Sequence, residues 1–406
     1  MTSKILALAL LGCTAAGVVL YPAYQGIGTS NVAPSHPVAG NQHPGSALTG
    51  DRPKVEVVFV LDTTGSMGGL IQAAKDKIWS IATTMAQAQP APEIRIGLVA
   101  YRDRGDSYVT RVVDLSTDLD SLYATLMEFQ ADGGGDGPES VNRALHDAVH
   151  EVSWGQDDDA YRVVFLVGDA PPHMDYQDDV KYPVTLAAAR RRGIVVNAIQ
   201  CGDSSDTAQS WQQVAQLGQG EYLRVEQSGG AVAIATPFDE KLATLSAQLD
   251  DTRLYYGSEE EKQQQKRKLE ATDKLHAGSS VASRARRATF NASESGAANL
   301  LGKGELVEDV ASGRVDLSSI EREALPASLQ AMSPKEQRVL IEQTARQRDA
   351  LKYEIRQLSG QRAAYLKQKV EEAGGAAESL DEKIYSTVRA QAAEKGLRYE
   401  AGAPSY

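Results

Sequence analysis

Apolar runs rich in β-branched residues alternate with amphipathic runs between residues 55 and 225, and this alternation limits the folds that the chain can form. We expect strands at residues 55–61, 94–101, 108–115, 161–167, 194–200 and 221–225. Between them we expect helices near residues 70–88, 118–130, 138–152, 180–192 and 207–217. Strands that alternate with helices in this way pair in parallel and carry helices on both faces. The pattern therefore predicts an α/β fold with a doubly wound, mostly parallel sheet flanked by helices.

Oxygen-bearing side chains follow the first of these strands. Asp62, Thr64 and Ser66 alternate in the run Asp62-Thr63-Thr64-Gly65-Ser66. A strand that breaks into a glycine turn before a helix presents such alternate side chains around one point at its carboxyl end, where open α/β sheets place their ligands. Taken alone, the run equally fits a turn in which Asp62 caps the following helix.

Two further segments place carboxylates near the same expected edge of the sheet. Residues 136–139 stand at the head of a predicted helix and end in Glu139, and Asp169 follows the strand expected at residues 161–167. The complete set contains oxygen ligands without Cys or His, which suits Mg²⁺, Ca²⁺ or Mn²⁺ rather than zinc. This co-occurrence favours a metal site over a simple helix cap.

These motifs resemble the von Willebrand factor A (integrin I-like) domain and its metal-ion-dependent adhesion site, over roughly residues 54–250. The Asp-x-Thr-x-Ser run is the family's first signature and implies Asp62, Thr64 and Ser66 as ligands. The Asp-x-Pro-Glu segment and the strand-end aspartate resemble the integrin β-subunit version, which implies Glu139 and Asp169 as the other ligands. The resemblance implies a Rossmann-like domain over residues 54–255, Mg²⁺ (or Mn²⁺ or Ca²⁺) as the ion, and a bacterial exported type of protein.

The integrin comparison also implies a second cation beside Glu139. Asp103 and Asp136 occupy the matching places, and a solvated turn with local ion pairs around Asp103 is the alternative. Another auxiliary site needs acidic residues just after the first motif. This chain has Gly68 and Gly69 there, so we expect that site to be missing.

Coordination chemistry suggests what the main site would do. Mg²⁺ prefers six oxygen ligands, so five protein groups leave a position open for an Asp or Glu of a partner protein. We therefore expect a divalent-cation-dependent protein-binding module, for adhesion or as a scaffold, and no enzyme. I-like domains can shift their last helix when the coordination changes, and the resemblance implies this helix near residues 238–254.

Two other functions stay open. In the first, the C-terminal helices form a homo-oligomer and the A-type domain is a structural scaffold with a degenerate metal site. In the second, the site is a metal-assisted phosphate or peptide hydrolase, although the sequence shows no general base beyond the ligands themselves.

The N-terminal segment predicts export. Residues 5–21 form an uncharged apolar stretch between the lengths of a signal-peptide core and a membrane span, so we expect residues 1–21 to be a signal peptide or an N-terminal membrane anchor, with a buried helix as a further alternative. Cys13 lies in a sequence that resembles a lipoprotein box, so lipidation there is the alternative. Residues 22–53, rich in Pro, Gly and Ser, predict a flexible linker. The protein would then be tethered to a membrane and face the periplasm or cell surface. Its net charge of −12 argues against a nucleic-acid partner.

The last third of the chain predicts helices. Residues 256–330 suggest a helical linker region, in which the basic patch at residues 284–287 reads as a solvated helix face. In the following region, residues 331–406, Ser333, Pro334 and Glu336 mark the start of a long helix that extends to about residue 372.

A short coiled coil or a helical hairpin is expected within this helix. The residues that approximate its apolar seam are Leu351, Ile355, Leu358 and Tyr365. Arg348 and Arg362 interrupt the seam, and Ser359-Gly360 suggests a break or kink.

Overall fold

The computed structural model describes residues 52–135, 137–230, 234–372, 377 and 379–399. The predictions of a leader over residues 1–21 and of lipidation at Cys13 lie outside the described residues, as does nearly all of the predicted linker. Within the described residues, no helix combines the length and apolar character needed to cross a membrane.

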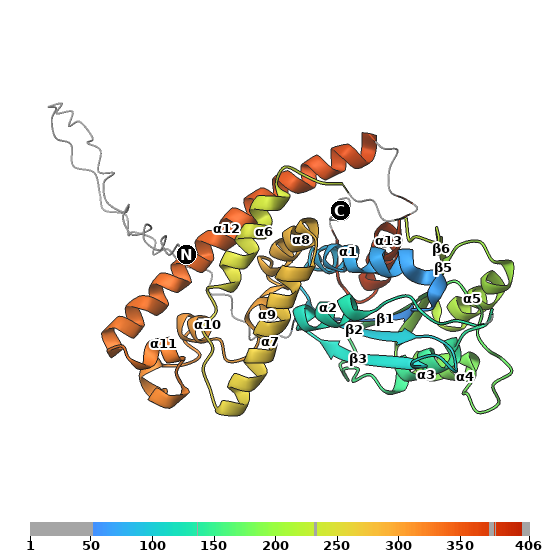
Figure 1. The fold of residues 1–406 in the computed structure, drawn as a ribbon, viewed down its shortest axis with the longest axis horizontal. Helices are drawn as coiled ribbons and strands as arrows, with labels where there is room; N and C mark the ends of the chain where they lie inside the picture. The colour runs from blue at the N-terminus through green and yellow to red at the C-terminus, as the bar shows by residue number, and fades with distance from the viewer. Residues whose placement is uncertain (1–51, 136, 231–233, 373–376, 378, 400–406) are drawn as a thin grey trace, which may run out of the picture. The chain divides into compact units, whose positions relative to one another are not determined.

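One six-stranded sheet organises the N-terminal half of the described chain (Figure 1). Its strands are β1 (Lys54–Asp62), β2 (Glu93–Tyr101), β3 (Thr110–Ser116), β4 (Tyr161–Gly168), β5 (Ile194–Cys201) and β6 (Gln219–Val225). They lie in the order β3-β2-β1-β4-β5-β6, with β3 antiparallel to β2 and all other neighbours parallel. The predicted fold class is confirmed, because every expected strand forms within a few residues of its predicted bounds.

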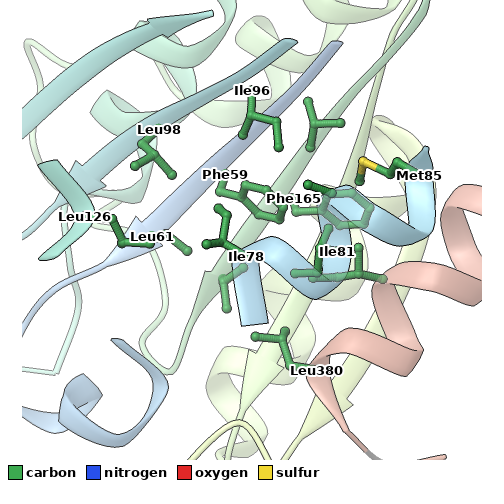
Figure 2. Packing of buried hydrophobic residues seen from close by; sticks show 14 of the residues in the cluster. Phe59, Leu61, Ile78, Ile81, Met85, Ile96, Leu98, Leu126, Phe165 and Leu380 are labelled. Atoms are coloured by element: carbon green, nitrogen blue, oxygen red, sulfur yellow. The ribbon is translucent and has the colours of Figure 1, made fainter. Parts of the chain in front are cut away.

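Helices cover both faces of this sheet. They are α1 (Gly68–Met85), α2 (Leu119–Glu128), α3 (Val141–His150), α4 (Tyr182–Arg191) and α5 (Ser205–Leu217). Successive strand residues point to opposite faces. Phe59 of β1 therefore packs with α1 and α2, whereas its neighbours Val58 and Val60 pack with α3, α4 and α5. Figure 2 shows Phe59 beside Phe165 of β4, with ring centroids 5.7 Å apart.

The C-terminal helix α13 (Leu380–Ala393) completes the first of these faces. Leu380, Ile384 and Val388 belong to the same buried cluster as Phe59 and Ile81, and Figure 2 shows Leu380 approaching α1. At the other end of the helix, Gln391 accepts a hydrogen bond from the Tyr161 hydroxyl at 2.7 Å. A segment from the end of the chain thus supplies part of the core of the sheet domain.

The helix expected near residues 238–254 forms as α6 (Asp239–Asp250), but its apolar side does not cover the sheet. Leu242, Leu245 and Leu249 instead pack against α8 (Val281–Asn291) and α12 (Pro334–Glu372). Helix α13, and not α6, packs beside α1 and β6. The helix that the resemblance implied as the last of the domain is therefore the first of a helical region.

The remaining helices of that region are α7 (Glu259–Gly278), α9 (Ala297–Leu301), α10 (Leu306–Ala311) and α11 (Ala327–Gln330), with short 3-10 turns at Leu317–Ser319 and Arg322–Ala324. The predicted start of α12 is confirmed. The Ser333 hydroxyl accepts from the Glu336 amide, and the Glu336 carboxylate accepts from the Ser333 amide, which is a capping box. The predicted break at Ser359-Gly360 is wrong, because α12 continues through both residues.

The two arginines that interrupt the predicted seam of α12 contact other helices of the same chain. Arg348 donates two hydrogen bonds to Glu305, at 2.8 and 2.9 Å, and Arg362 donates to Asp239 at 2.7 Å. Between them, the seam residue Ile355 packs against α6 and α8. Residues of the apolar seam therefore pack against helices of the same chain, while a coiled coil between chains stays a prediction.

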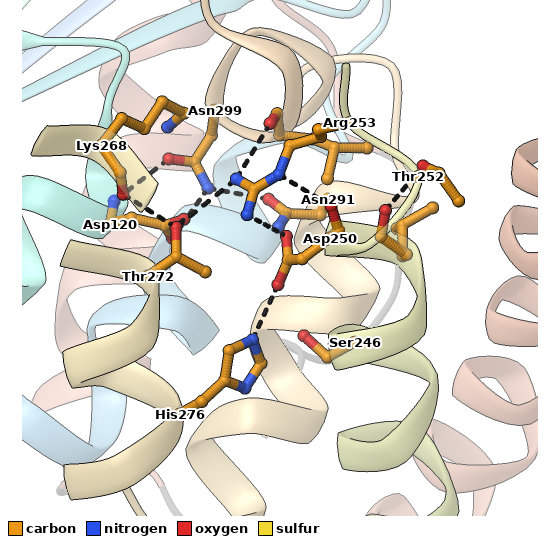
Figure 3. A network of polar contacts seen from close by, with 12 residues as sticks. Asp120, Ser246, Asp250, Thr252, Arg253, Lys268, Thr272, His276, Asn291 and Asn299 are labelled. Carbon is orange, nitrogen blue, oxygen red and sulfur yellow. Dashed lines mark hydrogen bonds and ion pairs between the residues drawn. The ribbon is translucent and has the colours of Figure 1, made fainter. Parts of the chain in front are cut away.

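The prediction that residues 284–287 form a solvated face is wrong for Arg286 and Arg287, which are buried. Arg287 lies between Asp120 of α2 and Asp250 of α6 and pairs with both. Figure 3 shows the polar network around Asp120 and Asp250, in which Asp250 also accepts from His276. Both acidic partners of Arg287 are distant in sequence, so charge counting along α8 alone could not reveal them.

Candidate functional site

Asp62 stands at the carboxyl end of β1 and is completely buried. Its Oδ1 atom accepts from the Thr64 amide at 2.9 Å and from the Thr64 hydroxyl at 2.7 Å. These bonds form a local turn and not a helix cap, because the cap positions of the 3-10 turn Gly65–Met67 and of α1 are Thr64 and Met67, and neither has a side-chain cap bond. The helix-cap alternative is therefore wrong for Asp62. Its Oδ2 atom, by contrast, is buried without a hydrogen-bond partner among the described residues. Because buried carboxylate oxygens are normally satisfied, Oδ2 has the character of a ligand atom.

The two hydroxyl residues of the motif lie on the turn that leads into α1. Thr64 is buried, Ser66 is exposed, and their hydroxyl oxygens are 3.4 Å apart. The amide of Gly65 donates to the carbonyl of Gly133 at 3.1 Å, which joins this turn to the glycine-rich loop before α3. The predicted Asp-x-Thr-x-Ser set is therefore gathered at one end of the sheet.

Glu139 lies at the entrance to α3, and a backbone bridge holds it there. Its amide donates to the carbonyl of Pro171, and its carbonyl accepts from the amide of His173. A Cβ added at Gly134 would lie 3.1 Å from Glu139 Oε1 and 3.1 Å from Thr64 Cβ, so Gly134 separates the two predicted ligands. The Oε2 atom of Glu139 is a second buried carboxylate oxygen without a partner in the described part of the chain.

Asp169 follows β4 directly and is half-buried. Its carboxylate accepts from Gln227 Nε2 at 2.6 Å, and its backbone carbonyl accepts from the Thr207 hydroxyl at 2.8 Å. Asp169 and Glu139 line one pocket of about 580 Å³ together with Thr64 and Ser66. The structure therefore brings the predicted residues to one edge of the sheet, with Asp62 buried at the end of β1.

The carboxylates influence one another. Burial, and to a lesser degree the charge of Asp169, raises the pKa of Asp62 to about 7, although hydrogen bonds from Thr64 oppose the shift. Burial, followed by the charges of Asp62 and other nearby acids, raises the pKa of Glu139 to about 9. Burial and the same negative charges raise the pKa of Tyr101 well above its ordinary value. Burial is the largest cause of all three shifts, and the neighbouring carboxylates add to it.

The acids alone do not form a closed metal cage. In the described residues, no group of three or more His, Cys, Asp or Glu side chains is arranged to hold a metal ion. A cation at this edge would therefore depend on the hydroxyls of Thr64 and Ser66 and on water as well. All of these donors are oxygens, so the residues fit a hard divalent cation.

Of the two residues predicted to hold a second cation, the structure describes Asp103 and not Asp136. Asp103 is buried and accepts from the Ser140 and Tyr176 hydroxyls, both at 2.8 Å. The nearest nitrogen of His173 lies 3.3 Å from the same carboxylate. Asp103 is thus not the solvated turn residue of the alternative. Its contacts support the segment around Glu139 whether or not a second cation binds.

Three residues at this edge were not singled out from the sequence. Tyr101 is buried with its hydroxyl close to Asp62, Arg102 contacts several of the loops, and Gln227 bonds to Asp169. Tyr101 ends β2, beside β1, and Arg102 follows it directly, so their position at the strand end was a usable signal. Gln227 lies on an exposed loop, and its sequence context gives no comparable signal.

Comparison with known sequences identifies the domain. The family model of the von Willebrand factor A domain matches residues 56–237. Von Willebrand factor A domain-containing protein 7 of Rattus norvegicus is 38% identical over 104 residues, which are 26% of this chain and 11% of the rat protein. The alpha-protein kinase vwkA of Dictyostelium discoideum is 28% identical over 120 residues, 29% of this chain and 19% of that protein. The chain therefore spans only about a tenth to a fifth of the curated relatives that it matches.

Solved structures with similarity include proximal thread matrix protein 1 from the mussel byssus, described with a zinc-occupied MIDAS motif. It has a TM-score of 0.34 and 17% identity, over 43% of this chain and 42% of that one. The SpRpn10 VWA domain has a TM-score of 0.33 and 12% identity, over 43% of this chain and 89% of its own. The family match, the curated relatives and the order of the strands agree. This is a protein with a von Willebrand factor A domain, and the family model matches its residues 56–237.

Proposed function

We propose that the domain is a divalent-cation-dependent protein-binding module whose site comprises Asp62, Thr64, Ser66, Glu139 and Asp169. The observation that carries the proposal is the pair of buried carboxylate oxygens, Asp62 Oδ2 and Glu139 Oε2, that lack a partner among the described residues. A buried carboxylate oxygen without a donor is costly, and a cation is the partner that would satisfy both of these oxygens together.

Each residue has a definite role in this proposal. Asp62, Glu139 and Asp169 supply negative charge, and Thr64 and Ser66 supply neutral oxygens. The two hydrogen bonds from Thr64 hold Oδ1 of Asp62, which leaves Oδ2 available. A bound divalent cation, Mg²⁺ or alternatively Mn²⁺ or Ca²⁺, would supply an open coordination position for an Asp or Glu carboxylate of a partner protein.

The proposed setting is extracytoplasmic. The apolar stretch at residues 5–21 supports a signal peptide or a membrane anchor, and the Pro-, Gly- and Ser-rich residues 22–53 support a tether. The domain then faces the periplasm or the cell surface, where it meets its protein partner.

The first test is calorimetric titration of Mg²⁺, Mn²⁺ and Ca²⁺ into the full chain, because α13 supplies part of the domain's core. We expect saturable binding in the wild type and its loss in Asp62→Asn. Asp273→Asn, at an exposed position on α7, is the matched control and should bind as the wild type does. A folded wild type that binds none of the three ions overturns the proposal.

The second test addresses the partner. Pairs of model peptides that differ only by Glu or Gln are presented to the full chain with Mn²⁺ or with a chelator. We expect measurable binding only for the Glu peptide and only with Mn²⁺. Equal binding of both peptides would show that a partner carboxylate is not what the site recognises.

A further inference from the structure

We infer that Arg102 is a positioning residue for the proposed cation site: its guanidinium joins the loops that carry Thr64 and Gly134. This inference rests on the proposed function of that site. Arg102 itself is not a ligand in the proposal, because its hydrogen bonds go to loop backbone and to polar side chains outside the ligand set.

The contacts of Arg102 converge from separate loops. Its Nε donates to the carbonyl of Thr63 at 3.1 Å, in the turn after β1. Its Nη2 donates to the carbonyl of Gln130 at 2.7 Å, in the loop after α2. Its Nη1 donates to the Ser107 hydroxyl at 2.9 Å, in the loop after β2, and lies 3.4 Å from Asp132 Oδ2. The side chain is buried, and its bond to Thr63 is buried as well, whereas Asp132 is exposed.

Backbone bonds carry this arrangement to the predicted ligands. The carbonyl of Thr63 also accepts from the amide of Asp132 at 3.2 Å, which joins the turn after β1 to the loop after α2 a second time. The carbonyl of Arg102 accepts from the amide of Ser140 at 3.3 Å, directly after Glu139. One residue therefore contacts the segments before Thr64 and after Glu139.

Arginine suits this place for geometric reasons. Its planar guanidinium presents donors in fixed directions, and here these directions match two carbonyls and a hydroxyl. The guanidinium also lies over the Tyr108 ring, 4.6 Å from its centroid. A lysine would keep the positive charge, but its single nitrogen could not bond to Thr63, Gln130 and Ser107 in this geometry. The substitution Arg102→Lys therefore keeps the positive charge but removes the hydrogen bonds that hold the loops in position.

The test compares Mn²⁺ affinity in the full-length wild type and Arg102→Lys by calorimetry, with thermal unfolding measured in parallel. Loss of residues that orient metal ligands typically weakens affinity about 10- to 100-fold, and we expect a loss in this range. Hydrogen exchange gives a second readout. The Asp132 amide, which bonds to Thr63, should lose protection in the variant while the amides of β4 keep theirs.

Arg348→Lys is the matched control. Arg348 is buried and donates to the carbonyl of Thr252 and to Glu305, in the helical region away from the site. The Arg348→Lys variant should lose about as much thermal stability as Arg102→Lys and should keep the Mn²⁺ affinity of the wild type. If Arg102→Lys does not fold, Arg102→Gln, which keeps a planar amide donor, provides the same comparison.

The outcomes separate the two proposals. If the wild type binds no cation, the proposed function fails. If the wild type binds Mn²⁺ and the folded Arg102 variant binds it equally well, only the positioning role fails. Equal losses of affinity in the Arg102 and Arg348 variants would also overturn it, because the effect would then follow general stability.

Discussion

Arg287 and Asp120 form a completely buried ion pair with two hydrogen bonds, although 167 residues separate them in the sequence. Nε donates to Oδ1 at 2.7 Å, and Nη2 donates to Oδ2 at 2.6 Å. The same guanidinium donates to both carboxylate oxygens of Asp250, at 2.7 and 3.0 Å. One side chain of α8 thus connects helix α2 of the von Willebrand factor A domain to helix α6 of the helical region.

Arg287→Met should strongly destabilise the protein. The substitution leaves the carboxylates of Asp120 and Asp250 buried without their main cation, and breaking a buried pair in this way typically costs about 3–5 kcal/mol. The free energy of unfolding from urea titration is the measurement. Arg267→Met, at an exposed position on α7, should change it by less than about 0.5 kcal/mol. Similar losses in both variants would show that the buried pair has no special role.

The same pair predicts how stability depends on pH. Burial alone would raise the pKa of Asp120, but the charge and hydrogen bonds of Arg287 outweigh burial and hold the pKa below its ordinary value of 3.8. The pKa of Asp250 is lowered in a similar balance. A carboxylate with a lowered pKa in the folded state stabilises the fold above its unfolded pKa, and this stabilisation is lost as the pH falls through the folded value.

We therefore expect the free energy of unfolding of the wild type to fall below about pH 4. In Arg287→Met the two carboxyls stay buried without the cation, so their pKa values should rise and protonation should no longer destabilise the fold. Urea unfolding between about pH 3 and pH 6 measures the difference. Parallel pH profiles for the two proteins would contradict this explanation.

Ile384→Ala tests the contribution of α13 to the sheet domain. Ile384 is 1% exposed and packs in the main core cluster, so its truncation should lower the free energy of unfolding by about 2–5 kcal/mol. Val339→Ala on α12 is the control, because Val339 is 44% exposed and should matter little. Both are measured by urea unfolding. A change at Ile384 as small as that at Val339 would mean that α13 is not part of the domain's stable core.

Gly168→Ala should disturb the predicted cation site directly. A Cβ at this position would lie 2.4 Å from the Tyr101 hydroxyl and 2.9 Å from Asp62 Cβ, so one of these side chains must move. We expect Mn²⁺ binding by the full chain to weaken at least tenfold, as is typical when the residues that orient metal ligands are disturbed. Gly360→Ala, with no atom within 4 Å of the added Cβ, should bind as the wild type does. Unchanged binding in folded Gly168→Ala would place the site elsewhere.

The sequence was most informative where local patterns decide the structure. The β-branched run at Val55–Leu61 and the cap at Ser333 both gave elements with nearly the predicted bounds, because neighbouring residues determine them. The site motif was equally local. Asp62 ends β1 and Asp169 follows β4, and the carboxyl ends of these parallel strands meet at one edge.

Long-range pairing could not be predicted in the same way. Arg286 and Arg287 looked like a solvated patch because the carboxylate of Asp120 is remote in sequence. The break expected at Gly360 followed from helix propensity, but α12 continues there, and the neighbouring Ser359 hydroxyl lies 2.7 Å from the Thr289 hydroxyl of α8. The position of α13 also depends on contacts with α1 and β6, which no local pattern in residues 380–393 specifies.

The place of α13 has a consequence for how the molecule is made. A ribosome releases β1 to β6 well before it synthesises residues 380–393, so one face of the sheet stays partly uncovered while about 150 further residues emerge. Helix α1 and strand β6 remain without α13 during that time. We therefore expect nascent chains of this protein to expose an apolar surface that chaperones can recognise, until α13 emerges and covers it.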